Sequence, residues 1–250
     1  MVEMAMQNDA WATAMIWQQI RRYFVGRSLF EILIVTIKTV VGAIQGLRPI
    51  ERRARWQLGA FDRQWGTETT NVVKRRDLDF PPDEAANFNQ YEVSAPDILQ
   101  KLLNIINLDP TEFTFVDVGA GKGRIVLEAS FVPFYRCIGV EYSEDLYDIA
   151  LTNTRLFVER AKPSVRPEFW HGDARDFRLP PGPLLLYLYN PFSLKILDEF
   201  ISRIENEISS QTRKIFLAYV NPEHLKIFGG RSHWQKVSEA PEITVFQLRA

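Results

Sequence analysis

An apolar stretch that ends in three alternating glycines is the feature that most constrains the fold of this chain. Residues 113–118 are rich in aromatic and β-branched side chains, Gly119, Gly121 and Gly123 follow, and a helical pattern begins at Arg124. Glycine adopts positive φ without strain and lets a ligand approach the main chain where a Cβ would block it. The free N–H groups at the helix start would face that ligand. The stretch therefore predicts a strand, a glycine turn and a helix that bind a nucleotide-type ligand.

The spacing of these glycines distinguishes between two nucleotide-type ligands. Nicotinamide dinucleotides are bound by the pattern G-x-G-x-x-G, but Arg124 occupies its third glycine position here, and the third glycine comes one residue earlier, at Gly123. The spacing therefore disfavours a nicotinamide enzyme. What remains is an acid, Asp117, that stands two residues before the first of three alternating glycines.

Three further predicted strands end in polar residues, in the order that a binding fold of this kind requires. The stretch 137–141 ends in Glu141, where an acid for a ribose diol is expected about 20 residues beyond the glycines. The stretch 169–174 closes on Asp173, and the apolar run 184–189 is followed by Asn190. A continuous apolar run is typical of a strand that is covered on both faces.

Taken together, Asp-x-Gly-x-Gly-x-Gly and these strand ends resemble the class I S-adenosylmethionine-dependent methyltransferases, from about Tyr91 to the C-terminus. The resemblance implies an α/β fold with a doubly wound, seven-stranded, mostly parallel, Rossmann-like sheet whose last strand is antiparallel. It implies S-adenosylmethionine as cofactor, with Glu141 on the ribose and Asp173 on the adenine amino group. Ser94 is either a cofactor contact or only the N-cap of a helix over 97–107. The expected cofactor-binding residues are Tyr91, Ser94, Asp117, Gly119, Gly121, Gly123, Glu141 and Asp173.

Asn190-Pro191-Phe192 is similar to the Asn-Pro-Pro-Tyr/Phe motif of methyltransferases that act on amino nitrogens. In that motif the Asn side-chain carbonyl and a proline main-chain carbonyl accept hydrogen bonds from the acceptor N–H. The resemblance implies catalytic roles for Asn190, Pro191 and Phe192. The second proline is missing, which argues against a flat base as acceptor, and a plain strand-end turn is the alternative. The glycine turn and the strand-end Asn also resemble the seven-strand lysine methyltransferases, so a protein lysine is the first acceptor expected and a small-molecule amine the second.

The first 60 residues form a predicted helical extension that differs in charge from the rest of the chain. They hold eight Lys/Arg and four Asp/Glu and so carry +4, whereas the whole chain carries −1. Within them, residues 29–47 form a predicted amphipathic helix with arginines beyond both ends. Packing on the catalytic domain or on a second subunit is the favoured interpretation, and peripheral attachment to an anionic membrane is the alternative. Glu31 and Lys38 argue against a membrane span.

The remainder of the chain is divided at residue 90. Residues 61–90 are a predicted connector that covers the substrate, because the stretch 61–70 concentrates aromatic and hydroxyl side chains without periodicity. Residues 91–250 are the predicted methyltransferase domain. The single cysteine and the spacing of the three histidines predict no metal site, and the charge pattern predicts no nucleic-acid partner. We expect a cytoplasmic protein, with any membrane contact made through 29–47. The oligomeric state is left open.

Two other functions use the same glycine turn. One is a nucleotide-sugar or nicotinamide enzyme, which the position of Arg124 disfavours. The other is a scaffold that binds a cofactor without catalysis and in which the helical extension is the working part. Substitution of Asn190 separates the scaffold from the methyltransferase, because only the enzyme would lose turnover while it still binds cofactor.

Overall fold

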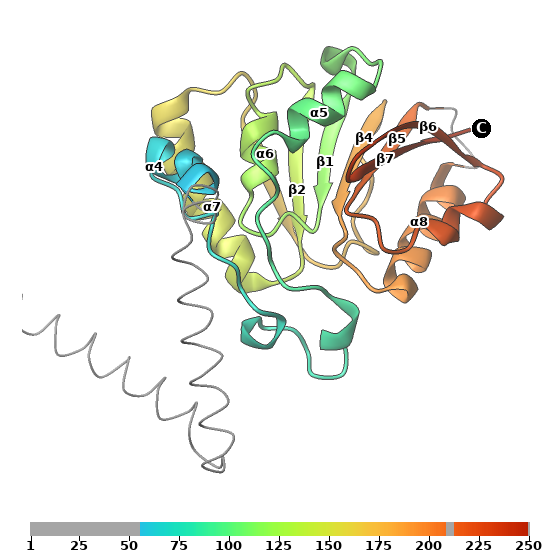
Figure 1. Ribbon diagram of the computed structural model, residues 1–250, viewed down its shortest axis with the longest axis horizontal. Helices are drawn as coiled ribbons and strands as arrows, with labels where there is room; N and C mark the ends of the chain where they lie inside the picture. Colours follow the sequence, from blue (N-terminus) through green and yellow to red (C-terminus); the bar gives the residue numbers. More distant parts are fainter. Residues whose placement is uncertain (1–55, 209–212, 250) are drawn as a thin grey trace, which may run out of the picture. The chain divides into compact units, whose positions relative to one another are not determined.

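A seven-stranded sheet runs through the computed structural model, which describes residues 56–208 and 213–249 (Figure 1). The strand order is β3-β2-β1-β4-β5-β7-β6. The first five strands in this order run parallel to one another, and β7 lies antiparallel between β5 and β6. The strands are β1 (Thr114–Val118), β2 (Arg136–Glu141), β3 (Pro167–His171), β4 (Leu184–Tyr189), β5 (Ile215–Val220), β6 (Trp234–Ala240) and β7 (Ile243–Leu248).

Both faces of the central strands are buried, which explains their continuous apolar sequence. Residues at alternate positions belong to two separate hydrophobic clusters: Leu184 and Leu186 pack on one face, and Leu185 and Tyr187 pack on the other. The first cluster is completed by α8 (Leu194–Ile208), and the second by α5 (Ile98–Ile105) and α6 (Arg124–Ala129). The sheet is therefore doubly wound, as the sequence predicts.

The remaining helices lie beside β3 and the glycine turn. The long helix α7 (Glu144–Ala161) contacts β3, and α4 (Ala60–Trp65) contacts α7. Short 3-10 helices connect the other elements: η1 (Arg75–Asp77), η2 (Ala85–Asn87), η3 (Pro110–Glu112) and η4 (Leu225–Gly230). The carboxyl ends of the parallel strands all lie at the same edge of the sheet. The ends of β1, β2 and β4 lie side by side in the middle of this edge.

Some predictions for single residues near these strand ends and helix starts agree with the structure, and others are wrong. Ser143 after β2 is a typical cap residue, and it caps α7, since its hydroxyl accepts a hydrogen bond from the Leu146 N–H at 3.2 Å. Ser94 does not cap α5: the helix begins after Asp97, and no side chain caps it. The place of His171 just before Asp173 in an apolar stretch predicts a buried strand residue, and this prediction is wrong, because His171 is exposed at the end of β3.

The predictions for the N-terminal region fall mostly on residues that the structure does not describe. The helical extension is described only from residue 56 onward, so its helix at 29–47 and the boundary at residue 60 stay predictions. Among residues 56–208 and 213–249, no helix combines the length and the hydropathy that crossing a membrane requires.

Candidate functional site

The glycine turn after β1 is shaped by backbone conformation and by close packing. Gly119, Gly121 and Gly123 have φ of 83°, 55° and 87°, which L side chains rarely adopt. A Cβ at each position would overlap a protein side chain and not only a ligand. The nearest atoms would be Pro191 Cβ at 2.6 Å from residue 119, Tyr91 Cδ2 at 2.3 Å from residue 121 and Phe169 Cζ at 2.7 Å from residue 123. The glycines thus let three distant segments pack on the turn.

A cavity with an empty volume of about 810 Å³ lies beside this turn. Its walls come from the ends of β1, β2 and β4 and from residues 80–94 of the preceding segment. The predicted residues that line it are Tyr91, Ser94, Asp117, Gly119, Gly121, Glu141, Asn190, Pro191 and Phe192.

Glu141 lies at the end of β2, with its carboxylate against the turn. Oε2 accepts a hydrogen bond from the Gly121 N–H at 2.7 Å, and Oε1 accepts one from the Ser143 N–H at 2.8 Å. Burial raises the pKa of Glu141, and the backbone hydrogen bonds oppose this rise only in part. The Tyr142 N–H adds a third backbone hydrogen bond, so the carboxylate, which offers about four lone-pair sites, can still accept one from a ligand hydroxyl.

Asp117 at the end of β1 is the most unusual group in the cavity. It is only 3% exposed, and it accepts no hydrogen bond from any residue that the structure describes. Burial raises its pKa well above 3.8, and the neighbouring charge of Glu141 raises it further. Buried polar groups in proteins nearly always have a partner, so such a carboxyl group points to a ligand that brings a hydrogen-bond donor or a positive charge.

Tyr91 and Ser94 both lie in the cavity wall. The Tyr91 ring packs on Gly121, its hydroxyl donates to the Thr69 carbonyl at 2.6 Å, and burial raises its pKa. Ser94 lies with Oγ 3.3 Å from the hydroxyl of Tyr187, a buried residue of β4. The site therefore uses Ser94 as a wall residue, and the prediction of a helix cap at this position is wrong.

Asp173 does not line the cavity. β3 ends two residues earlier, at His171, and Arg175 holds both Asp173 carboxylate oxygens, with Nη2 to Oδ2 at 2.6 Å and Nε to both at 3.0 Å. Burial raises the pKa of Asp173, but the hydrogen bonds and charge of Arg175 outweigh it, and the net shift is downward. Gly172 and Ala174, on either side, do line the cavity. The structure does not bring the predicted adenine ligand into the site.

Three aromatic rings in the cavity wall were not singled out from the sequence. Phe88 stacks on Phe80 and on Tyr142, with centroids 4.7 Å apart in both pairs. Tyr142 directly follows Glu141, so its place after a strand end was a usable signal. Phe80 and Phe88 come from the predicted connector, and no sequence pattern ties them to this site. The rings provide flat apolar surfaces on which a heterocycle could stack.

Asn190, Pro191 and Phe192 follow β4 at the edge of the cavity. Asn190 has φ of 41°, and its Oδ1 accepts a hydrogen bond from the Tyr219 hydroxyl at 2.9 Å. The Pro191 carbonyl accepts one from the Asn89 N–H at 3.1 Å. Both carbonyls predicted to meet the acceptor thus already have one partner and keep one lone pair. The Phe192 ring is buried and packs against Phe88.

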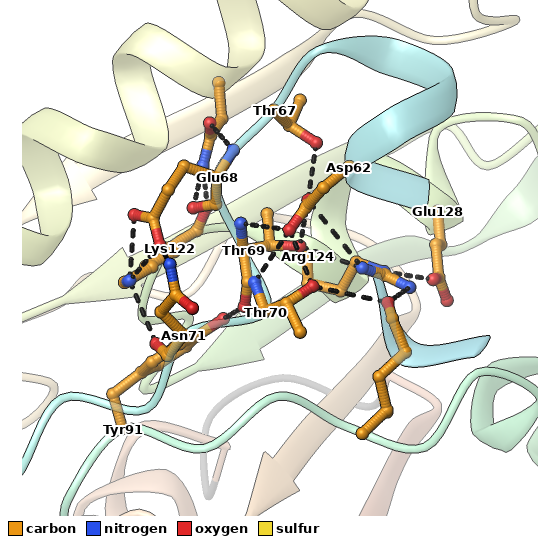
Figure 2. Close-up of polar contacts among 12 residues, drawn as sticks. Asp62, Thr67, Glu68, Thr69, Thr70, Asn71, Tyr91, Lys122, Arg124 and Glu128 are labelled. Carbon is orange, nitrogen blue, oxygen red and sulfur yellow. Dashed lines mark hydrogen bonds and ion pairs between the residues drawn. The ribbon is translucent and has the colours of Figure 1, made fainter. Parts of the chain in front are cut away.

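Residues 58–71, called the strap below, are tied to the glycine turn by a polar network (Figure 2). Asp62 is its centre. Its carboxylate accepts hydrogen bonds from the hydroxyls of Thr67, Thr69 and Thr70 and from the N–H groups of Thr69 and Thr70, at 2.6 to 2.9 Å. Burial alone would raise the pKa of Asp62, but these bonds together lower it below 3.8.

Lys122, inside the glycine turn, holds the far end of the strap. Its buried Nζ donates to both Glu68 oxygens, at 2.6 and 2.8 Å, and to the Asn71 carbonyl at 3.0 Å. Asn153 of α7 completes the contact, since its Nδ2 donates to the Glu68 and Lys122 carbonyls at 3.0 Å. The strap, the turn and α7 therefore meet at one point (Figure 2).

Arg124, whose presence disfavoured a nicotinamide site, has a structural use. Its guanidinium is buried, donates from Nη1 to Thr69 Oγ1 at 2.8 Å and from Nε to Glu128 Oε1 at 2.5 Å, and stacks 4.2 Å from the Phe61 ring centroid. The residue after the third glycine thus anchors the strap. Among the described residues, no group of His, Cys, Asp or Glu is arranged to hold a metal ion.

Part of the chain is similar to known proteins. The family model described as "Histone methylation protein DOT1" matches residues 84–164, which is less than half of the chain and includes the glycine turn and Glu141. No curated protein matches the sequence. The resemblance implied a seven-stranded, mostly parallel sheet whose last strand is antiparallel, and the structure has this sheet, so the class I methyltransferase fold is confirmed.

Solved structures with partial similarity include several methyltransferases. One is an RNA methyltransferase from Salinibacter ruber in complex with S-adenosyl-L-homocysteine, at 19% identity over 62% of this chain and 92% of that chain, with a TM-score of 0.43. Another is precorrin-6y C5,15-methyltransferase from Geobacter metallireducens, at 17% identity over 63% and 90%, with a TM-score of 0.45. A third is a predicted N6-adenine-specific DNA methylase from Listeria monocytogenes, at 12% identity over 62% and 51%, with a TM-score of 0.47.

Proposed function

We propose that this chain, which has the class I methyltransferase fold, binds S-adenosylmethionine in the cavity beside the glycine turn and transfers its methyl group to an acceptor nitrogen. The observation that carries the proposal is Asp117, a buried cavity carboxyl group that no described residue satisfies. S-adenosylmethionine brings an ammonium and a sulfonium charge, and either would compensate this carboxylate. Glu141 offers a free lone pair to a ribose hydroxyl, and the rings of Phe88 and Tyr142 offer a surface to adenine.

The chemistry asks little of the protein beyond orientation. When bound, S-adenosylmethionine would supply a methyl group on a good leaving group, so that a C–N bond forms as the C–S bond breaks and a thioether remains. The acceptor nitrogen must be neutral when it reacts, so an ammonium acceptor first loses one proton to water, and the positive charge of the sulfonium passes to the methylated nitrogen. The chain's own residues align the acceptor at the end of β4 and exclude water with the segment 80–94. The lone pairs left on Asn190 Oδ1 and on the Pro191 carbonyl can accept from the acceptor N–H.

Two acceptor classes come from the sequence. A protein lysine is supported by the description of the matching family model, which names histone methylation. A small-molecule amine is the second class, and the missing second proline after Asn190 argues only against a flat base as acceptor. A cofactor-binding scaffold is the remaining candidate, and it differs from both in that no methyl transfer occurs.

The cofactor is tested by calorimetric titration of the full chain with S-adenosylmethionine, S-adenosylhomocysteine and NAD. Both adenosyl ligands should bind in the micromolar range, and NAD should not. Asp117→Asn should lower the affinity for S-adenosylmethionine, and Glu141→Gln should lower the affinity for both adenosyl ligands. Glu168→Gln, which alters an exposed carboxylate of β3 outside the cavity, is the control and should change neither. Folded wild-type protein that binds neither adenosyl ligand would overturn the proposal.

A further inference from the structure

A second cavity, which is open to solvent, adjoins the cofactor cavity at the end of β4. The two cavities share five wall residues, which include Asn190, the residue that carries the predicted acceptor contact. Anything bound in the second cavity can therefore reach the rim where a methyl group would be delivered. The shared residues are Asn89, Gln90, Glu92, Tyr189 and Asn190.

The unshared walls of this second cavity carry charges of both signs. Lys74, Arg75 and Arg76 come from one short stretch at η1, and Glu223 comes from the loop after β5. Arg76 lies 3.6 Å from Asp77, whereas Lys74, Arg75 and Glu223 form no ion pair with a residue that the structure describes. All three are in the open parts of the wall, so their charges are available to a ligand.

The shared wall adds another carboxylate, Glu92. It accepts a hydrogen bond from Gln90 Nε2 at 2.5 Å, and no cation of the described residues pairs with it. Glu92 lies in the wall that faces both cavities, together with Asn190. The second cavity thus joins two cations without carboxylate partners, Lys74 and Arg75, with two carboxylates without cationic partners, Glu92 and Glu223.

This charge pattern discriminates between classes of acceptor. A lysine side chain brings only a positive charge, which suits Glu92 and Glu223 but adds repulsion beside Lys74 and Arg75. A nucleic acid brings only negative charge near the cations, and it leaves the carboxylates to repel it. A small molecule that carries both an amine and an acidic group compensates both sides at once.

We propose that the second cavity is the acceptor site and that its substrate is a small zwitterionic amine, with a carboxylate or phosphate held by Lys74 and Arg75 and the amine directed past Glu92 toward Asn190. This inference rests on the proposed function. The acceptor loses one proton to water before reaction, its lone pair forms the N–C bond, and the electrons of the broken S–C bond stay on sulfur. The carboxylates attract the ammonium form, and the lone pairs at Asn190 and Pro191 orient the neutral form.

The test measures equilibrium binding and does not depend on turnover. Protein saturated with S-adenosylhomocysteine is titrated with phosphoethanolamine, γ-aminobutyrate, an amidated lysine peptide and a short uridine oligonucleotide. We expect one or both zwitterions to bind and the peptide and the oligonucleotide to bind more weakly or not at all. A carboxylate preference and a phosphate preference are distinguished by the first two probes.

A charge variant then locates the site. The double variant Lys74→Gln/Arg75→Gln should weaken zwitterion binding by about tenfold or more, as expected for the loss of two charge-assisted contacts. Its affinity for S-adenosylhomocysteine should stay unchanged, because neither side chain lines the cofactor cavity. The matched control is Arg155→Gln/Arg166→Gln, which removes two exposed arginines that line a separate groove at α7 and β3 and should change neither affinity.

Three results would overturn the inference. In the first, S-adenosylhomocysteine binds, but neither zwitterion binds even at millimolar concentration. In the second, the lysine peptide or the oligonucleotide binds more tightly than either zwitterion. In the third, a zwitterion binds equally well to the Lys74/Arg75 variant. If S-adenosylhomocysteine itself does not bind, the result contradicts the proposed function and not this inference alone, so the two failures are distinguishable.

Discussion

Lys122 Nζ lies 2.6 Å from Glu68 Oε1, which joins the glycine turn to a residue 54 positions earlier in the chain. The two partners are buried unequally: the Lys122 side chain is 3% exposed, and that of Glu68 is 46% exposed. The ammonium is therefore desolvated, while the carboxylate still meets water. Because a buried unpaired charge costs more than an exposed one, the two halves of this ion pair should respond differently to substitution.

Substitutions at Lys122 and Glu68 test this asymmetry. Glu68→Ala leaves the buried Lys122 ammonium without its carboxylate partner and should lower the free energy of unfolding by about 2 kcal/mol. Lys122→Met keeps the apolar stem in place, leaves a half-exposed carboxylate, and should cost only about 1 kcal/mol. Urea unfolding of the two variants and of the double variant gives the coupling between them. Equal losses in the single variants, or strict additivity, would contradict this account.

Asp62 should make the strap sensitive to acid. Its folded pKa lies below 3.8, so its contribution to stability is present above this value and is lost as the pH falls through the folded pKa. Asp62→Asn cannot accept all five hydrogen bonds and should cost roughly 2 kcal/mol at pH 7. The difference between wild type and variant should shrink below pH 3.8. Urea unfolding across pH measures it, with Asp83→Asn, at an exposed carboxylate outside the strap, as control. A difference that does not vary with pH would rule the mechanism out.

Gly121 and Gly182 separate backbone strain from steric overlap. Both have positive φ, 55° and 84°, but a Cβ at Gly121 would lie 2.3 Å from Tyr91, whereas none of the described atoms lies within 4 Å of a Cβ at Gly182. Gly182→Ala should cost only the strain, about 1 kcal/mol. Gly121→Ala must also displace Tyr91 from its bond to Thr69 and should cost roughly 3 kcal/mol or more. Similar midpoint temperatures of thermal unfolding for the two variants would show that the Tyr91 ring moves aside at little cost and would contradict this prediction.

Much of the central sheet could be predicted because its signals are local. A continuous apolar run such as 184–189 identifies a strand covered on both faces, and an acid at the end of a strand, such as Glu141, needs no long-range knowledge. The glycine turn is equally local, because positive φ at alternate residues demands glycine. These elements agree in position and type with the structure, and Glu141 and Asp117 both lie in one cavity.

The polar partners could not be predicted, because nothing periodic marks them. Lys122 and Glu68 are a pair only in the folded chain, and either one alone reads as a solvated charge. Asp173 lies outside the cavity because of a contact between near neighbours in the sequence: Arg175, two residues later, donates hydrogen bonds to its carboxylate. The ring of Phe192 is buried and packs against Phe88, and the residue also lines the cavity at the end of β4. Aromatic residues at strand ends serve both purposes, and the sequence does not distinguish them.

Asp117 should couple pH to both stability and cofactor binding. Its folded pKa is raised well above 3.8, so the stability that the neutral carboxyl group contributes is complete below this value and is lost as the pH rises through the raised pKa. At neutral pH, Asp117→Asn should therefore stabilise the ligand-free protein by about 1 kcal/mol or more.

The same substitution should act oppositely on binding. S-adenosylmethionine should bind the ionised carboxylate, so wild-type affinity should fall as the pH is lowered through the raised pKa. Asp117→Asn should bind roughly tenfold to a hundredfold more weakly at neutral pH and show a flatter pH profile. Calorimetry at several pH values measures both. An unchanged profile in the variant would assign the pH dependence to another group, Glu141 first.

Asn190 and Asn221 form a matched pair at the ends of β4 and β5. Each has positive φ, 41° and 45°, each precedes a proline, and each bonds to a tyrosine of the neighbouring strand: Tyr219 donates to Asn190 Oδ1, and Asn221 Nδ2 donates to Tyr189. Only Asn190 lines the cofactor cavity as well as the second one. Substitution by glycine keeps the backbone conformation at both sites and removes only the amide.

The two glycine variants should therefore lose similar stability but differ in catalysis. Asn190→Gly should lower kcat by about a hundredfold, as expected when an orienting contact to the reacting nitrogen is removed, and should leave the affinity for S-adenosylhomocysteine unchanged. Asn221→Gly should alter KM for the acceptor with little change in kcat, since it lines only the second cavity. A labelled-methyl assay measures both constants. Equal kcat in the two variants would remove Asn190 from the reaction, and methyl transfer that neither wild type nor variant performs would leave the chain a cofactor-binding scaffold.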